Sequence, residues 1–256
     1  MGTRDTYEPG TFSWAELATT DAAAAKAFYG ELFGWEFEDS DTGGGPIYSM
    51  ASVDGKHVGA LFEATDGPPR WNAYITVDDV DESTEKAKEA GAGIVAEPFD
   101  VMDAGRMAVV QDPSGAAVSL WQAKDHAGAQ LVNAPGALCW NDLMTHDVEK
   151  AVEFYAEVFD WDIGAVEDAP DDRHGIRVGE RMNGGIAKLP ESMGADVMPH
   201  WLSCFAVEDV AASLKTVEEH DGTPLSDVIE VPSGHYAVVA DPQGSVFAVV
   251  DGEMDD

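Results

Sequence analysis

The period of the hydrophobic positions changes along the chain, and the same change occurs four times. An alternating apolar and polar stretch predicts a strand, the 3.6-residue spacing that follows predicts an amphipathic helix, and three further short alternating stretches predict strands. In WAELATTDAAAAKAFYGELFGW, residues 14–35, the helix begins after Asp21 and places Phe28, Leu32 and Phe33 on one face. Turn sequences such as DTGGGP, VDGK and DPSG separate the strands. The pattern predicts a βαβββ unit that is present four times.

The chain is also a tandem repeat at a longer distance. WNDLMTHDVEKAVEFYAEVFDW, residues 140–161, repeats residues 14–35, and GHYAVVADPQGSVFAVV repeats GRMAVVQDPSGAAVSLW. We therefore expect two domains, at residues 8–124 and 136–252, joined by the linker DHAGAQLVNAP.

The net charge of the chain excludes some classes of binding partner. The chain has 14 Lys and Arg against 49 Asp and Glu, a net charge of −35, which repels nucleic acid and anionic membrane surfaces. Acidic residues spread over helix faces and loops indicate a halophilic source. The 2 cysteines form no CxxC pair, and neither a signal peptide nor an apolar run long enough to span a membrane is visible. We expect a cytoplasmic protein that binds neither nucleic acid nor membrane, as a monomer or a homodimer.

Several motifs resemble those of one superfamily. D…A..FY...FGW after the first strand, WNAYI.VDDVD, DAGRM, and DPSG or DPQG before the last strand are similar to motifs of the vicinal oxygen chelate superfamily, which includes glyoxalases, bleomycin-resistance proteins and extradiol dioxygenases. The similarity is strongest to tandem glyoxalase-like proteins of the actinobacterial glyoxalase/hydroxylase type. It implies an α+β fold in which four βαβββ modules form two domains with cup-shaped mixed sheets. Such a cup binds a small organic molecule and usually a divalent metal.

The resemblance also implies where metal ligands would stand. In the first domain these positions hold Trp14, Asn72 and Ser119, and none is a good ligand for a divalent metal. The second domain has Trp140, Leu202 and Ala248 there. The seven histidines share no metal-binding spacing. We therefore expect no metal and no other cofactor.

Period-two alternation predicts which side chains face each cup, counted from Trp14 and Trp140. The predicted ligand-binding residues of the first cup are Trp14, Asn72, Tyr74, Ser119 and Trp121, and its predicted catalytic residues are Glu16 and, on the neighbouring strand, Arg106. The predicted ligand-binding residues of the second cup are Trp140, Asp142, Cys204 and His235. His235 stands at the position that Arg106 has in the first repeat, and the apolar Leu202 and Ala248 also line this cup. An aromatic wall beside a carboxylate suits a flat or cationic organic ligand.

Other interpretations remain open at this level. Trp14 and Trp140 fit core packing equally well, whereas the Phe-Tyr pairs at 28–29 and 154–155 are predicted to pack their helices on the sheets. The favoured function is a small-molecule-binding protein with metal-independent lyase, isomerase or hydroxylase chemistry. The alternatives are non-catalytic sequestration of a toxic or antibiotic compound, and a metal-dependent glyoxalase or dioxygenase with atypical ligands such as Glu16, Asp142 or His235.

Overall fold

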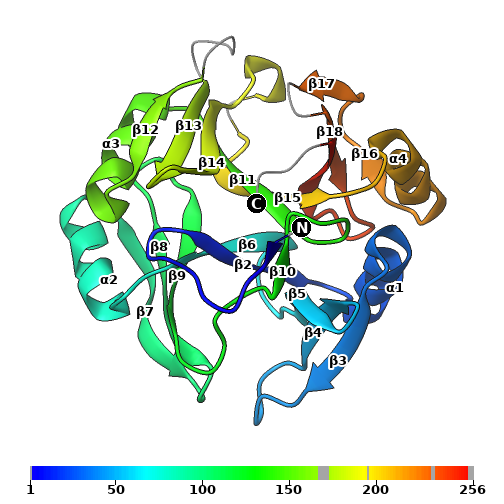
Figure 1. Ribbon diagram of the computed structural model, residues 1–256, viewed down its shortest axis with the longest axis horizontal. Coiled ribbons are helices and arrows are strands. Elements are labelled where there is room, and N and C mark those ends of the chain that lie inside the picture. Colours follow the sequence, from blue (N-terminus) through cyan, green and yellow to red (C-terminus); the bar gives the residue numbers. More distant parts are fainter. Residues whose placement is uncertain (1, 167–172, 195, 232–233, 253–256) are drawn as a thin grey trace.

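Two large mixed sheets make up most of the protein in the computed structural model, which describes residues 2–166, 173–194, 196–231 and 234–252 (Figure 1). The first sheet has the strand order β3-β4-β5-β2-β6-β9-β8-β7, and the second has β12-β13-β14-β11-β15-β19-β18-β16, with β17 paired to β18. A short pair, β1 with β10, joins the N-terminal segment to the linker. The expected α+β fold of four βαβββ modules is confirmed.

The elements of the first half follow the predicted order. They are β1 (Gly2–Thr3), β2 (Phe12–Thr19), α1 (Ala22–Phe33), β3 (Glu36–Ser40), β4 (Tyr48–Val53), β5 (Lys56–Glu63), β6 (Arg70–Thr76), α2 (Val80–Glu89), β7 (Gly93–Val101), β8 (Gly105–Gln111), β9 (Ala117–Ala123) and β10 (Leu131–Val132).

The second half repeats this order. Its elements are β11 (Leu138–Thr145), α3 (Val148–Phe159), β12 (Asp162–Ala165), β13 (Arg173–Val178), β14 (Arg181–Lys188), the 3-10 turn Glu191–Met193, β15 (His200–Ala206), α4 (Val210–Glu219), β16 (Thr223–Pro224), β17 (Ile229–Val231), β18 (Gly234–Ala240) and β19 (Val246–Gly252).

An aspartate starts each helix. Asp21, Asp79, Asp147 and Asp209 each accept a hydrogen bond from the backbone N–H three residues later. This N-cap satisfies one of the N–H groups that have no partner inside the helix. The acidic helix starts seen in the sequence are therefore capping groups.

The two sheets pack back to back, with α1 and α4 on one side of the contact and α2 and α3 on the other (Figure 1). One core joins α1 and the β2 face to α4, β18 and β19, and a second joins α2, β8 and β9 to α3 and β14. The cores therefore cross the domain boundary. Because the sheets meet through their helix-covered faces, their opposite faces point away from each other. Each of these opposite faces is called a concave face, after the cup that the resemblance implies.

Two matching hydrogen-bonded clamps hold this contact. The Tyr29 hydroxyl donates to Asp241 Oδ2 over 3.0 Å and accepts from Trp71 Nε1 over 3.2 Å. In the other core, the hydroxyl of Tyr155 donates to Asp112 Oδ2 over 3.0 Å and accepts from Trp201 Nε1 over 2.9 Å. The predicted helix packing of the Phe-Tyr pairs is confirmed, and each tyrosine also binds the aspartate of the DPSG or DPQG turn in the other domain. Burial and the adjacent aspartate raise the pKa of both tyrosines well above the ordinary value.

Trp35 and Trp161, which end the two copies of the repeated motif, fix the chain at the point where it enters each domain. Trp35 Nε1 donates to the Gly136 carbonyl over 2.7 Å, and Trp161 Nε1 donates to the Gly10 carbonyl over 2.8 Å. Gly136 has φ of 80°, and a Cβ there would lie 2.7 Å from the Phe33 carbonyl oxygen. Glycine at this position thus permits the close approach of the linker to the end of α1.

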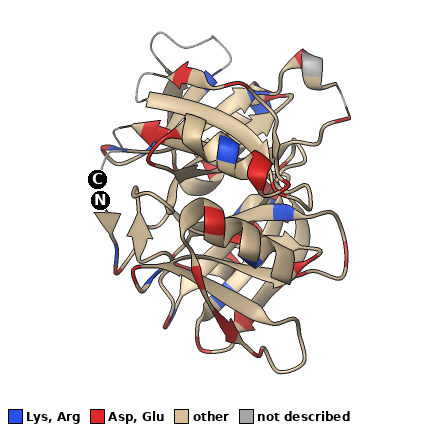
Figure 2. Cartoon of the chain, turned by 90° about the vertical axis from the view of Figure 1, so that its right-hand side faces the viewer, with Lys and Arg blue, Asp and Glu red and all other residues tan. Residues whose placement is uncertain are grey.

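Asp and Glu positions are distributed over helices, strands and loops of both halves of the chain, with fewer Lys and Arg positions between them (Figure 2). No helix within the described ranges has the length and hydropathy needed to cross a membrane.

Candidate functional site

The concave face of the first sheet brings together the residues that alternation assigned to it. Trp14 lies opposite Tyr74, Tyr74 is in register with Ser119, and Glu16 lies opposite Asn72. Residues in register on neighbouring strands point to the same side of a sheet, so these five share one face.

A hydrogen-bond network surrounds Glu16 on this face. The Tyr48 hydroxyl donates to Glu16 Oε2 over 3.0 Å, and Trp14 Nε1 donates to the Tyr48 oxygen over 3.1 Å. Tyr74 and Asn72 also hydrogen-bond to the carboxylate. Three polar side chains, all neutral, therefore hold one carboxylate.

The surroundings of Glu16 change its acidity. Burial raises its pKa above the ordinary value, and this effect outweighs the opposing influence of the hydrogen bonds and of the Arg70 charge. Glu16 nevertheless keeps part of its surface accessible. Tyr48 and Tyr74 have pKa values raised well above normal by burial, and secondarily by the Glu16 charge, so they remain hydrogen-bond donors.

The three aromatic residues predicted here form the floor of the face. Trp14, Tyr74 and Trp121 are only 3%, 4% and 5% exposed, and the indole N–H of Trp121 donates to the His126 carbonyl over 2.9 Å. Surface that a ligand can reach is contributed by five more accessible side chains. These are Tyr48, Met50, Phe62, Met107 and Phe99, of which Phe99 is 45% exposed.

The interdomain linker covers one end of this face. The His126 ring packs edge-on against Trp14, with centroids 4.6 Å apart, and Ala129 N–H donates to the Ser13 carbonyl. Tyr7 completes the cover by donating its hydroxyl to the Ala129 carbonyl over 2.6 Å. Burial lowers the pKa of His126 to about 4, and its Nε2 is buried without a hydrogen-bond partner among the described residues. The imidazole is therefore neutral at physiological pH.

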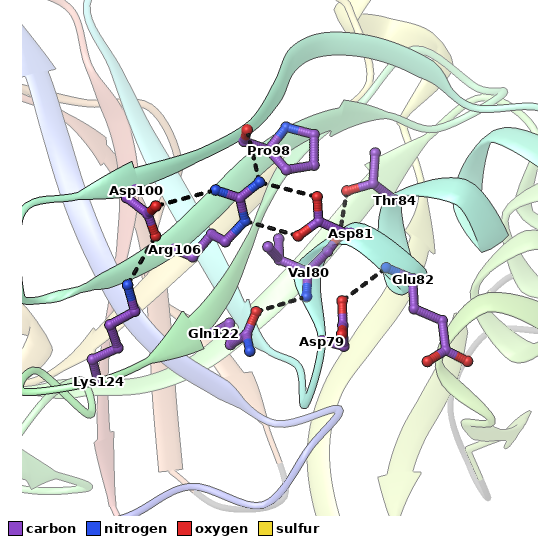
Figure 3. Close-up of polar contacts among 10 residues, drawn as sticks. All are labelled: Asp79, Val80, Asp81, Glu82, Thr84, Pro98, Asp100, Arg106, Gln122 and Lys124. Carbon is purple, nitrogen blue, oxygen red and sulfur yellow. Dashed lines mark hydrogen bonds and ion pairs between the residues drawn. The ribbon is translucent and has the colours of Figure 1, made fainter.

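Arg106 lies outside the first concave face, which corrects the prediction that placed it there (Figure 3). It is in register with Gln122, whereas its neighbour Met107 pairs with Trp121 and faces the cup. The Arg106 guanidinium binds both oxygens of Asp81, at 2.8 and 3.0 Å, and lies 3.4 Å from Asp100. It thus ties the start of α2 to β7, and it lowers the pKa of Asp81 by hydrogen bonding to its ionised form.

The second concave face holds its carboxylate differently. Asp142 is 1% exposed and accepts from Arg173 Nη2 over 2.7 Å and from Trp140 Nε1 over 2.9 Å. Cys204 is in register with Trp140 and Ala248 on this face but is fully buried, and burial raises the pKa of its thiol well above the ordinary value. Leu202 and Ala248 are buried as well. Trp140, Asp142 and Cys204 therefore share this face as predicted, with an ion pair between Asp142 and Arg173 at its centre.

His235 does not reach the second concave face, contrary to the prediction. It is in register with Asp251, while Tyr236, on the opposite side of the strand, pairs with Val250. His235 Nδ1 lies 2.9 Å from Asp251 Oδ1, and Asp251 also accepts from the N–H of Val210 at the start of α4. The pair supports a helix start and has no access to the cup.

Neither face has a donor set suited to a divalent metal. No three His, Cys, Asp or Glu side chains within the described ranges lie close enough together to hold an ion. Glu16 and Asp142 are the carboxylates at the centre of the two faces, and Asp142 is already bound to Arg173. Divalent metals in proteins take several imidazole, carboxylate or thiolate ligands. The residues present do not fit the metal that the family usually binds.

A model of the Glyoxalase/Bleomycin resistance protein/Dioxygenase superfamily matches residues 11–120 and again residues 128–249. The chain belongs to this superfamily.

Relatives that match over nearly their whole length include a protein named "Putative glyoxylase CFP32" from Mycobacterium tuberculosis. It is 40% identical over 258 residues, which cover 98% of each chain. A protein named "Anthracycline biosynthesis protein DauV", from a Streptomyces strain, is 32% identical over 96% of this chain and 94% of its own.

Solved structures share the fold at low sequence identity. The Mn(II)-bound glyoxalase from Novosphingobium aromaticivorans has a TM-score of 0.68 at 16% identity, with 97% of this chain and 84% of the glyoxalase covered. The 2,3-dioxygenase LapB from Pseudomonas sp. KL28 has a TM-score of 0.69 at 14% identity, with 98% and 96% covered.

Sequence reasoning missed three residues that decide the character of the two faces. Tyr48 was detectable, because it follows a DTGGGP turn and begins a strand, β4, on which alternation assigns faces. Arg173 carried no motif, and its contact with Asp142 depends on strand register. His126 was not predicted to take part in the site, and its burial against Trp14 follows from the path of the linker.

Proposed function

We propose that this protein binds a flat aromatic organic molecule in the first concave face and that Glu16 exchanges a proton with the bound molecule without a metal. The observation that carries the proposal is the state of Glu16: a carboxylate with a raised pKa and some accessible surface, held by neutral donors. General acid–base groups work best when their pKa is close to the working pH, and burial moves a glutamate in that direction.

The network assigns a role to each neighbour of Glu16. Tyr48 donates to Glu16 Oε2 and is itself held by the indole of Trp14, so the carboxylate is fixed in orientation. In the ionised form Glu16 can take a proton from the bound molecule, and in the protonated form it can return the proton to another atom of that molecule. This sequence is an isomerisation, and proton removal alone is the first step of many lyase reactions.

The walls of the face indicate the ligand class. Aromatic and methionine side chains at Tyr48, Phe62, Met50, Met107 and Phe99 offer polarisable apolar surface around Glu16. An ionised Glu16 also favours a ligand with a positive charge. The names of the relatives agree with such a ligand, since the fused rings of an anthracycline are flat and aromatic.

An anthracycline is a suitable probe because its own fluorescence reports binding. We expect saturable quenching with the wild-type protein, followed by a product that chromatography separates from the probe. Mass spectrometry should give this product an unchanged mass if it is an isomer and a lower mass if it arises by a lyase reaction. Glu16→Gln should bind the probe and leave it unchanged. Asp142→Asn, the counterpart in the second face, should retain conversion provided that circular dichroism shows it folded.

The outcomes separate the proposal from its alternatives. Unaltered probe recovered after tight binding would contradict proton transfer to this ligand class and support sequestration. Retention of about one equivalent of metal per chain after dialysis, together with loss of conversion on its removal, would overturn the metal-independent mechanism.

A further inference from the structure

A cavity of about 390 Å³ lies where the N-terminal segment crosses the second domain. Its walls come from residues 4–12, from the end of the linker, from the start of β11 and from the turn between β13 and β14. In Figure 1 the N-terminal segment and β10 lie together near the centre of the view, where the two halves of the chain meet. Pockets of this volume are typical of small-molecule sites. Neither Glu16 nor any other member of its network lines this cavity.

Two arginines, Arg4 and Arg181, line the cavity. Arg4 belongs to the N-terminal segment, and Arg181 begins β14. Neither forms an ion pair with another described residue, in contrast to Arg106 and Arg173, which bind aspartates. One carboxylate, that of the exposed Glu8, also lines the cavity. The net charge of the lining is therefore positive in a chain whose total charge is −35.

The floor supplies an aromatic ring and a buried amide. The indole N–H of Trp140 is already bound to Asp142, so the partly exposed ring presents its apolar surface to the cavity. Asn141 is 1% exposed, and its Oδ1 accepts a hydrogen bond from Ser203 over 3.0 Å. Its Nδ2 has no hydrogen bond to another described residue.

From these features we infer that the junction between the domains holds a second ligand site, for an organic carboxylate with an aromatic body. The forked guanidinium matches the two oxygens of a carboxylate and forms short, charge-assisted hydrogen bonds with it. The Trp140 ring packs against the apolar part of the ligand. Because the field of a protein with charge −35 repels anions elsewhere, binding of a carboxylate depends on this local positive pair.

Benzoate tests the site, with benzamide as a neutral ligand of nearly the same shape. In ¹H–¹⁵N NMR spectra, benzoate should shift the indole N–H signal of Trp140 in a saturable manner, and benzamide should not. The signal is assigned by its loss in Trp140→Phe. Arg181→Gln should weaken benzoate binding about tenfold, the effect of removing one charge-assisted hydrogen bond. Arg4→Gln should weaken it in the same direction.

A matched control lies in the preceding strand. Arg177 is exposed on β13 and does not line the cavity, so Arg177→Gln should leave the benzoate affinity unchanged. Equal binding of benzamide, equal loss in Arg177→Gln, or no saturable shift at Trp140 would each overturn the inference. Glu16→Gln should bind benzoate as the wild type does. Loss of binding in that variant would place benzoate in the first concave face and would also overturn the inference, whereas failure of the proposed Glu16 chemistry would leave it intact.

Discussion

The two concave faces carry a carboxylate at the same place in the repeat but hold it in opposite ways. Glu16 lies opposite Ala60, and Asp142 lies opposite Gly185. Two residues further along, Tyr48 pairs with Phe62 and Arg173 pairs with Ala187, so Tyr48 and Arg173 occupy equivalent positions. A phenol therefore faces Glu16 where a guanidinium binds Asp142.

The remaining neighbours differ in the same sense. Around Glu16 the first face has Tyr74, Asn72 and Ser119, and the second has Cys204, Leu202 and Ala248 at the corresponding register positions. One copy of the repeat has a polar network around an accessible carboxylate, and the other encloses its carboxylate in an ion pair. The partner at one strand position, Tyr48 or Arg173, therefore decides whether the carboxylate beside it is available for chemistry.

The largest effect is expected from breaking the ion pair of the second face. Arg173→Leu leaves Asp142 buried with only the Trp140 N–H, and removal of one partner of a buried pair costs about 3 kcal/mol of unfolding free energy, a low value in the usual range because Arg173 is 41% exposed. Urea denaturation measures the change. The control is Arg70→Gln, an exposed arginine near Glu16, which should change stability by less than about 0.5 kcal/mol. Equal stability of Arg173→Leu and the wild type would show that Asp142 does not depend on this pair.

His126 lies in the linker that covers Trp14, and its buried ring should make the stability of the protein depend on pH. The pKa of His126 is lowered to about 4, so the unfolded chain takes up a proton at His126 before the folded chain does, and stability falls as the pH drops from about 6.5 to 4. His126→Phe keeps the ring contact and should remove about 3 kcal/mol of this decline between pH 7 and pH 4. Denaturation of both proteins at pH 7 and pH 4 tests it. Parallel losses of stability in the two proteins would contradict the buried, neutral imidazole.

The two tyrosine clamps should behave alike, in contrast to the two carboxylates. Tyr29→Phe and Tyr155→Phe each remove a buried hydrogen bond to an aspartate oxygen in the other domain, at a cost of about 1–2 kcal/mol of unfolding free energy. The difference between the two variants should be small, because their contacts have the same geometry. A large effect in only one of them would show that the two interdomain cores are unequal.

Tyr48 is the position at which the two faces differ, and Tyr48→Arg tests it. This variant places a guanidinium beside Glu16 and should lower the pKa of Glu16 and abolish any proton transfer.

The smallest expected effect on stability comes from Glu16 itself. At neutral pH, Glu16→Gln should stabilise the protein slightly. Because the raised pKa of Glu16 means that its ionised form is disfavoured in the folded state, this gain disappears below the ordinary glutamate pKa. A stabilisation that persists unchanged in acid would show that the ionisation of Glu16 is not its cause.

Much of this organisation could be predicted from the sequence, and the limits have physical reasons. The tandem repeat and hydrophobic period define the four βαβββ modules, and alternation from Trp14 correctly groups Glu16 with Asn72, Tyr74 and Ser119. Alternation within one strand does not reveal the register between strands, which is why Arg106 and His235 were assigned to the wrong face. The clamps between Tyr29 and Asp241 and between Tyr155 and Asp112 depend on how the domains pack, and no local pattern encodes that contact.

The pKa of Glu16, measured from its side-chain carboxyl signal in a ¹³C NMR titration, tests the central claim most directly. Assignment uses the loss of the signal in Glu16→Gln, and Tyr48→Arg provides the comparison. We predict an inflection above the ordinary glutamate value of about 4.3 in the wild type and a lower one in Tyr48→Arg. An inflection at or below the ordinary value in the wild type would show that Glu16 is held as firmly ionised as a carboxylate in an ion pair, and would contradict the division between a reactive and a structural face.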